Sequence, residues 1–421
     1  MTILRECPAA TSPSVWKSGN VPRFEPFRGL RYDPERAPVA QVIAPPYDVI
    51  SSNQRTRLAS RHPANAVLVE LPETDLGGGR DRYAVATDLF TTWQEDGLLL
   101  ADAEPSLYPY RMTDQAGRST TGVIGALGLA EPGAESDILP HEQTLPKPKS
   151  DRLDLLRATR ANLSPIWGLS MAAGVTATFD PTDDDPVADA YDDDGVRHQL
   201  WVLSDPDAVA AVGAAVAKAP VVLADGHHRY ETARAYQAEC READGGQPGP
   251  YDLVMALVVE LAEDQLTVGA IHRTVSGLPE GFDLVGALAE WFDVVRAGAA
   301  DNRTLGALAD SNSLTLVQGG QAYLLLPRAE TQEQAGNDLD SSLLATVLAA
   351  LPEHEVMHRH SVAEALEALQ SGEAQAAFLL RPVTVKQIDE WANERRRMPP
   401  KTTYFSPKPR TGMVFRSLDL G

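Results

Sequence analysis

Cysteine is almost absent from this chain of 421 residues, which holds two, Cys7 and Cys240. They lie far apart and lack CxxC spacing, so neither a disulfide framework nor a structural zinc site is expected. No apolar run approaches the roughly 20 residues that cross a bilayer. Residues 1–21 lack the apolar stretch of a signal peptide and are expected to form a mobile tail. The sequence therefore predicts a cytoplasmic protein without a membrane anchor.

Positive charge is also scarce. The chain has 37 Lys and Arg against 59 Asp and Glu, which gives a formal net charge of −22. Proteins that bind duplex nucleic acid normally present a basic face. The long-range field of this chain instead repels nucleic acids and anionic membranes. We therefore expect a small-molecule substrate as partner, whereas the sequence leaves the oligomeric state open.

The composition is that of a globular protein, with 43% hydrophobic and 23% charged residues. The succession of helix and strand patterns predicts an α+β fold of mixed sheets with flanking helices. We expect residues 22–275 to form one region, with an acidic loop at 180–195. A second α/β region is expected over 276–421, with a basic loop at 395–416. Eight aspartates between 180 and 194 indicate a solvated hairpin or linker. A calcium site is the alternative, although the spacing of an EF-hand is missing.

Local patterns give several element predictions. Apolar spacings of three and four predict a helix over 82–97, and a buried strand is predicted over 66–71. A hairpin is expected between strands 107–112 and 122–129, and another between 252–261 and 266–271. Residues 354–358 match the zinc-protease pattern HExxH, but their alternation predicts a strand, which cannot place both histidines on one helix face.

The strongest motif, Asp-Gly-His-His-Arg at 225–229, directly follows the apolar strand 220–224. Gly226 permits a sharp turn, and a helix is expected from about 230 to 241. The amino end of such a helix presents free N–H groups and a positive dipole end, which favour an anion. Arg229 can hold phosphate by two hydrogen bonds, and Asp225 can hold a metal or orient a histidine. A surface turn or a two-histidine metal site are the alternatives.

Three other loops carry candidate groups. Asp48 follows a rigid Pro-Pro-Tyr sequence, where it can serve as a base, a magnesium ligand or a helix cap. Glu142 can act as a general base, with Lys149 or Arg152 near phosphate, unless the segment is an ordinary solvated loop. The stretch 395–416 holds seven basic residues and no acidic one. It can form an anion pocket or merely neutralise acidic faces.

Residues 223–233 resemble the Asp-Gly-His-His-Arg motif of the ParB/sulfiredoxin-like superfamily, in which free-serine kinases use nearly this string at the nucleotide phosphates. Over roughly 22–421 the chain is similar to a bacterial and archaeal family called domain of unknown function one thousand and fifteen. That second resemblance rests on residues 44–51, 141–144, 151–153, 225–229, 272–273 and 398–408.

The resemblance implies a ParB/sulfiredoxin-like core and phosphoryl transfer to a small hydroxylated metabolite, with free L-serine as the leading acceptor. Such chemistry requires mainly positioning and charge neutralisation, with Mg²⁺ expected. The sequence lacks a GxxxxGK(S/T) loop, so ATP, ADP and pyrophosphate all remain open as donors. The alternatives are a nucleotide-responsive ParB-like module without catalysis, or a metal-dependent hydrolase that uses His141, His227 and His228.

These arguments define two sets of residues that are expected to line one pocket. The expected catalytic residues are Asp48, Glu142, Asp225 (also the metal ligand), His227, His228 and Arg229. The expected phosphate and substrate ligands are Gly226, Tyr230, His141, Lys149, Arg152, His272, Arg273, Lys401 and Lys408.

Overall fold

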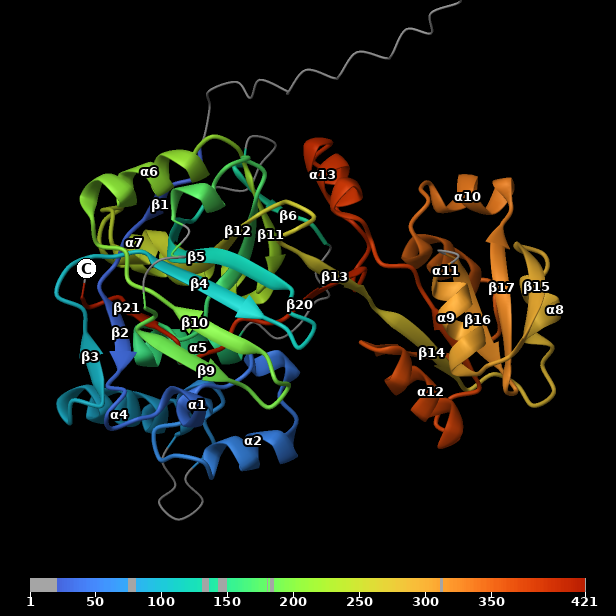
Figure 1. The fold of residues 1–421 in the computed structure, drawn as a ribbon, viewed down its shortest axis with the longest axis horizontal. Helices are drawn as coiled ribbons and strands as arrows, with labels where there is room; N and C mark the ends of the chain where they lie inside the picture. Colours follow the sequence, from blue (N-terminus) through green and yellow to red (C-terminus); the bar gives the residue numbers. More distant parts are fainter. Residues whose placement is uncertain are drawn as a thin grey trace, which may run out of the picture.

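The computed structural model describes residues 21–74, 81–130, 136–142, 150–179, 181, 185–310 and 313–420. It shows a large body and a smaller lobe (Figure 1), each built on a sheet with flanking helices. The predicted mixed α and β class is therefore confirmed. No helix in these ranges has both the length and the apolar character needed to span a membrane.

The body contains a nine-stranded sheet of order β6-β11-β8-β12-β5-β4-β10-β9, with β1 paired to β5. At its centre β12 (Leu253–Glu260) lies between β5 (Ser119–Gly128) and β8 (Ile166–Ser170). These strands are buried on both faces, which explains their continuous apolar sequences. The other strands are β1 Phe24–Glu25, β4 Tyr108–Thr113, β6 Ile138–Pro140, β9 Ala188–Tyr191, β10 Arg197–Leu200 and β11 Val221–Asp225.

Both faces of this sheet are covered. Helices α6 (Pro206–Val216) and α7 (His227–Ala243) pack on one face through side chains such as Val216 and Tyr230. The other face is covered by α13 (Val385–Asn393) and by the segment that follows it, through Ile388 and Phe405. The final part of the chain therefore belongs to the body.

A four-stranded sheet brings the two ends of the described chain together. Its order is β3-β2-β21-β7, with β2 (Gly29–Tyr32) next to β21 (Phe415–Ser417), β3 at Leu99–Ala101 and β7 at Ala161–Asn162. Helix α4 (Arg82–Glu95), which confirms the helix predicted over 82–97, packs against this core.

The strand predicted over 66–71 is wrong, because the chain forms the short helix α3 (Val67–Glu70) there. The amide of Val67 donates to the side chain of Asn65 at 3.0 Å, which starts the turn. Val67 and Val69 are both fully buried in the same cluster as α4. A short apolar run without alternation fits a buried helix as well as a strand, so tertiary packing decides.

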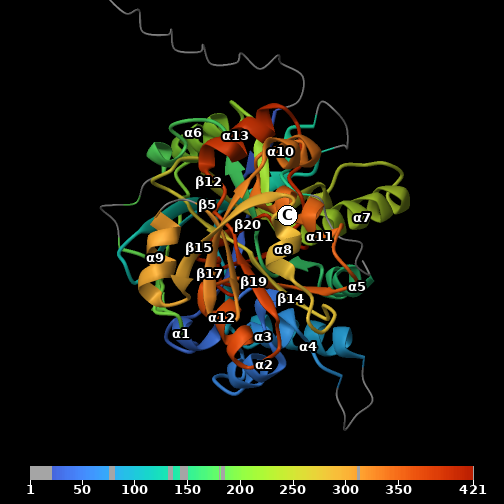
Figure 2. The same ribbon diagram turned by 90° about the vertical axis from the view of Figure 1, so that its right-hand side faces the viewer.

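The lobe consists of a six-stranded sheet between His272 and Leu379, with helices on both faces (Figure 2). The HExxH segment lies in its edge strand β18 (Glu355–Arg359), so the predicted strand is confirmed. The division of the chain at 275/276 stays a prediction. The strands in sheet order are β15 Phe292–Ala299, β17 Gln321–Pro327, β16 Leu314–Gln318, β19 Ala376–Leu379, β14 His272–Ser276 and β18.

The remaining helices of the protein are α1 Val39–Val42, η1 Tyr47–Val49, α2 Ser52–Ala59, α5 Ser150–Thr159, η2 Thr176–Thr178, η3 Pro250–Asp252, α8 Leu284–Leu288, α9 Asn302–Asp310, α10 Ala329–Ala335, α11 Asp340–Leu348 and α12 Val362–Gln370.

One predicted hairpin is present and the other is not. Strands β4 and β5 pair as expected. The pairing of 252–261 with 266–271 is wrong, because β13 (Thr267–Ala270) instead pairs with β20 (Thr403–Ser406). This long-range pairing brings the C-terminal basic segment next to the end of β11.

The acidic segment forms the β9–β10 hairpin, as one of its two interpretations expected, although 180 and 182–184 lie outside the described residues. In its turn, Asp192 accepts hydrogen bonds from Arg410 Nε at 2.9 Å and from the fully buried His198 at 2.8 Å. The hydroxyl of Tyr110 lies 2.7 Å from the other ring nitrogen of His198. Part of the basic segment therefore neutralises this acidic turn. No group of three metal-ligating side chains occurs in the described ranges.

Candidate active site

The Asp-Gly-His-His-Arg motif forms the junction between β11 and α7. Gly226 has φ +83°, and a side chain there would press on Ile166, so the turn requires glycine. Helix α7 begins at His227, which is three residues earlier than expected. Both histidines therefore lie in its first turn, where the backbone N–H groups have no partner within the helix. The positive end of α7 is thus open to an anion.

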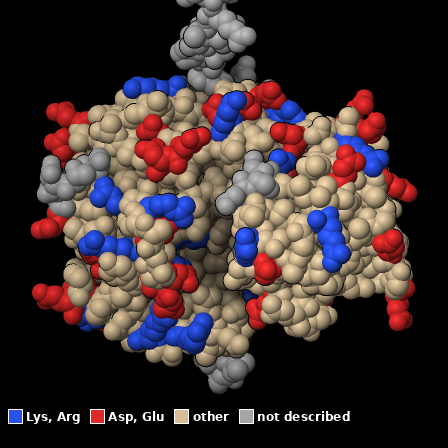
Figure 3. All heavy atoms as spheres, turned by 45° about the vertical axis from the view of Figure 1, so that its right-hand side comes forward, with Lys and Arg blue, Asp and Glu red and all other residues tan. Residues whose placement is uncertain are grey.

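This helix end faces a cavity of about 190 Å³, which we call the polar cavity. It opens where body and lobe meet, in the hollow visible in Figure 3. Most of the predicted catalytic residues converge there from distant parts of the sequence. The predicted residues that line it are Asp48, Glu142, Asp225, Gly226, His227, His228, Lys401 and Lys408.

Asp225 is held between two cations. Its carboxylate accepts hydrogen bonds from Lys408 Nζ at 2.8 Å and from Arg229 Nη2 at 3.2 Å. Burial alone would raise the pKa of Asp225, but the charges of Lys408 and Arg229 hold it at about 2. The carboxylate is therefore ionised, and it fixes the ammonium group of Lys408 at the cavity wall.

Arg229 lies behind the cavity and does not line it. Its side chain is 11% exposed and also donates to Pro165 O at 2.6 Å and to Ser164 Oγ at 3.1 Å. It ties the start of α7 to the segment before β8. Arg229 therefore positions Asp225 and does not itself line the polar cavity.

Glu142 holds the loop before β20. Its carboxylate accepts the backbone N–H groups of Lys401, Thr402 and Thr403 at 2.8–3.1 Å, and the hydroxyl of Thr403 at 2.7 Å. Burial opposes ionisation, but the neighbouring His141 and these hydrogen bonds bring the pKa of Glu142 to about 2. A carboxylate of such low basicity is a poor general base near neutral pH.

Lys401 depends on this arrangement. Its backbone has φ +58°, which is uncommon for a residue with a side chain. Arg273 donates to its carbonyl oxygen at 2.7 Å, while Glu142 holds its N–H group. These two hydrogen bonds hold the strained backbone of Lys401 in place, as is typical of functional loops. They also direct Lys401 to the polar cavity.

Two histidines lie side by side with ring centroids 5.2 Å apart, and one of them, His227, lines the polar cavity. His141 uses both ring nitrogens, one on Leu223 O at 2.5 Å and one on Thr403 Oγ1 at 2.6 Å. Nε2 of His227 is buried and has no hydrogen-bond partner among the described residues. Burial and the nearby His141 lower the pKa of His227 to about 3, so its ring is neutral. A buried polar atom without a partner is costly, and a bound ligand would supply one.

Asp48 is the exposed carboxylate of the polar cavity. No hydrogen bond or ion pair joins it to another residue that the structure describes. It does not cap α2, because Ser51 accepts the N–H group of Gln54 at 3.3 Å and fills that role. Asp48 is therefore available to a bound hydroxyl group or metal ion.

The remaining predicted residues lie elsewhere. Arg152 lies 4.5 Å from the ring centroid of Tyr47 and donates to Glu70 O at 2.7 Å, so it supports the loop of Asp48 from behind. His272 is buried at the root of the lobe and accepts the N–H group of Leu380 at 3.1 Å. Lys149 lies outside the described residues, and Tyr230 faces a second cavity.

Two aromatic rings from different parts of the fold also line the polar cavity. The rings of His360, from the lobe, and Tyr404, from the body, stack 4.7 Å apart at the cavity wall. Tyr404 belongs to the conspicuous segment 398–408, so a signal for it existed. Nothing in the local sequence marks His360, because only the placement of the lobe brings it to the site.

The role of Glu142 gives a pH-dependent prediction for the variant Glu142→Gln. The pKa in the folded protein, about 2, is below the ordinary 4.5. Ionised Glu142 therefore stabilises the fold above about pH 4.5, and this contribution is lost as the pH falls towards 2. We expect the variant to lose about 3 kcal/mol of unfolding free energy at pH 7, and much less at pH 3. Urea denaturation at both pH values measures this, and a difference independent of pH would contradict the role.

Comparison with known proteins agrees with the motifs. Residues 24–351 match the family described as Protein of unknown function (DUF1015). The chain belongs to this family. No curated protein matches the sequence. The family resemblance inferred from the motifs is thereby confirmed.

Several solved structures are similar at low identity. A free serine kinase in complex with AMP shares 14% identity, with 68% of this chain and 90% of that chain covered and a TM-score of 0.37. A conserved hypothetical protein from Pyrococcus furiosus shares 14% identity, with 68% of this chain and 94% of that chain covered and a TM-score of 0.35. SbnI with a C-terminal truncation, from Staphylococcus aureus, shares 13% identity, with 66% of this chain and 83% of that chain covered and a TM-score of 0.37.

Proposed function

We propose that this protein transfers a phosphoryl group to the hydroxyl group of a small metabolite, with free L-serine as the leading acceptor, on a ParB/sulfiredoxin-like core. One observation carries the proposal. The polar cavity combines the amino end of α7, two lysines and the available carboxylate of Asp48. Phosphoryl transfer requires this combination of charge neutralisation and a group that orients the hydroxyl.

The phosphoryl group is bound at the amino end of α7. The N–H groups of His227 and His228 point towards the anion, and Lys401 and Lys408, which line the same cavity, add positive charge. Lys408 is held in place by Asp225 at 2.8 Å. Because these groups are already positioned, they stabilise the charge on the transferring group without reorganisation.

The acceptor hydroxyl group lies at Asp48. Asp48 accepts its proton while the hydroxyl oxygen attacks phosphorus, and the bond from phosphorus to the leaving oxygen of the donor breaks. The electron pair of that bond remains on the leaving oxygen. A cavity of about 190 Å³ is suited to an acceptor as small as serine together with the transferring group.

The residues present also fit a magnesium ion, which takes oxygen ligands from one or two carboxylates and from phosphates. Asp225 accepts one hydrogen bond on each carboxylate oxygen, which leaves lone pairs for a metal. It lies next to the end of α7, where the phosphates are bound. Asp225 would hold the ion, which would neutralise phosphate charge, and Asp48 remains the base.

The metal-dependent hydrolase is less well supported. Both ring nitrogens of His141 are already hydrogen-bonded, so this residue is not free to join His227 and His228 on a metal ion. A non-catalytic nucleotide-responsive module is an outcome of the test that follows.

The test is phosphoserine formation from L-serine, with Mg²⁺ and with ATP, ADP or pyrophosphate in turn, followed by ³¹P NMR. We expect Lys408→Ala to lower the rate at least about a hundredfold, because it removes a preorganised cation. Lys386→Ala, an exposed lysine on α13 that lines neither cavity, is the matched control. Binding of nucleotide without phosphoserine would favour the non-catalytic module. If no phosphate compound binds, the proposal is wrong.

A further inference from the structure

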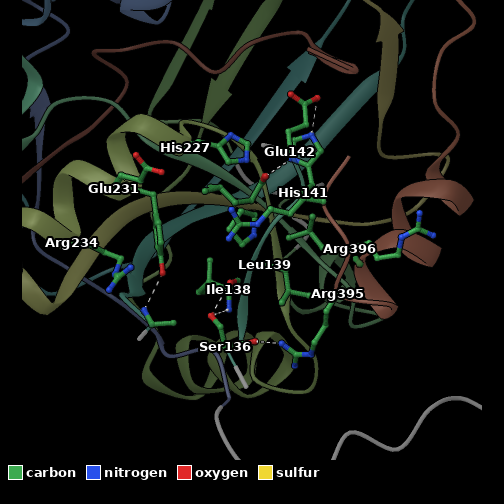
Figure 4. A pocket seen from close by; sticks show the side chains of 17 residues that line it. Ser136, Ile138, Leu139, His141, Glu142, His227, Glu231, Arg234, Arg395 and Arg396 are labelled. Carbon is green, nitrogen blue, oxygen red and sulfur yellow. Dashed lines mark hydrogen bonds and ion pairs between the residues drawn. The ribbon is translucent and has the colours of Figure 1, made fainter. Parts of the chain in front are cut away.

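A second cavity, of about 330 Å³, adjoins the polar cavity. His227 and Glu142 line both, so the two spaces meet at these side chains. Figure 4 shows His227 and Glu142 at one end of the second cavity and Ile138, Leu139 and Arg395 further along it. We call it the arginine-rimmed cavity.

Its floor is apolar. The parallel strands β6 and β11 contribute Ile138, Leu139, Val222 and Leu223, all of which are buried in the core. Tyr230 of α7 adds an aromatic wall. Such a surface binds the flat or apolar part of a ligand, since fully polar molecules gain nothing from leaving water for it.

Its rim is cationic. Arg395, Arg396 and Arg397 follow α13 in a single turn and are all exposed. Arg395 has φ +53° and is anchored by a hydrogen bond to Ser136 O at 2.8 Å. No hydrogen bond or ion pair joins Arg397 to another described residue. The strained turn holds three positive charges at the mouth of an apolar space.

We propose that the arginine-rimmed cavity binds the nucleoside part of a nucleotide, whose phosphates pass His227 into the polar cavity. This inference rests on the proposed function and narrows its donor. Serine and pyrophosphate are small and polar throughout, so neither uses the apolar floor. A base and ribose do, and about 330 Å³ is within the range of small-molecule sites. Arginine can stack on a base and pair with phosphate, and the unpartnered Nε2 of His227 lies at the junction.

The experiment compares ADP with pyrophosphate, which lacks the nucleoside, by calorimetric titration. Ala392→Phe fills the cavity from α13, where Ala392 is buried in its wall. We expect this variant to weaken ADP binding at least about tenfold and to change pyrophosphate binding less than about twofold, because only ADP enters that space.

Arg397→Glu is a second variant, at an exposed position where folding is not at risk. We expect it to weaken ADP binding at least about tenfold, because it removes a guanidinium group that can stack on the base and adds a negative charge that repels the anionic nucleotide. Arg303→Glu, on an exposed residue of α9 away from both cavities, controls for the change in net charge. Its ADP affinity should equal that of the wild type.

The outcomes separate the two proposals. If Ala392→Phe affects ADP and pyrophosphate alike, or if Arg397→Glu binds ADP as well as Arg303→Glu does, the nucleoside site is wrong. Failure of the wild type to bind ADP would overturn it as well. If ADP binding follows the expected pattern and no phosphoserine forms, the nucleoside site stands and phosphoryl transfer to serine fails.

Discussion

Asp48→Asn is expected to lower the rate of phosphoryl transfer by about a hundredfold to ten-thousandfold, the usual contribution of a positioned general base. Asparagine keeps the size and the hydrogen-bonding capacity of the side chain, but it cannot take the proton of the acceptor hydroxyl. Asp48 is exposed and has no partner among the described residues, so the fold should be unaffected. The measurement is kcat and KM for the acceptor with a saturating donor.

The control for Asp48→Asn is Asp264→Asn, in the exposed turn between β12 and β13, away from both cavities. It removes the same charge and should keep the wild-type rate. An Asp48 variant with wild-type kcat would show that another group takes the proton. A rise in KM at unchanged kcat would limit Asp48 to substrate binding.

Arg229→Ala is expected to destabilise the protein by about 3–5 kcal/mol, the usual cost of removing one partner from a buried ion pair. The substitution removes one of the two cations that hold the buried Asp225, and it leaves Pro165 O and Ser164 Oγ without their donor. Urea denaturation gives the change in unfolding free energy. The sequence had instead predicted that Arg229 holds a phosphate by two hydrogen bonds.

Arg57→Ala, at an exposed position on α2, is the matched control and should change stability by no more than about 0.5 kcal/mol. A stable Arg229→Ala protein without turnover would contradict the buried role. It would restore the interpretation of Arg229 as a direct phosphate ligand.

The sequence predicts those elements of the fold whose evidence is local. Periodicity identified α4, and two alternating runs across a short turn identified the β4–β5 pair. The same reasoning failed for β13, because its partner β20 lies more than a hundred residues further along the chain. A turn at Glu263-Asp264 is compatible with a hairpin but does not enforce one. Long-range competition between edges decides the pairing, and no local pattern records it.

The candidate site shows the same division. Asp225, Lys401 and Lys408 could be found from unusual clusters of charge, and all three line the polar cavity. The roles of Glu142 and Arg229 could not, because a carboxylate that holds backbone N–H groups and one that accepts a proton look alike in sequence. Side-chain direction depends on the finished packing.

The late position of Lys401 and Lys408 has a consequence for synthesis. The histidine motif leaves the ribosome long before these lysines, and the segment that bears them is fixed when β21 pairs with β2 near the start of the described chain. A nascent or prematurely terminated chain carries the Asp-Gly-His-His-Arg motif but lacks the two lysines of the polar cavity. Under the proposed function, a chain that ends before Phe415 is therefore expected to be inactive.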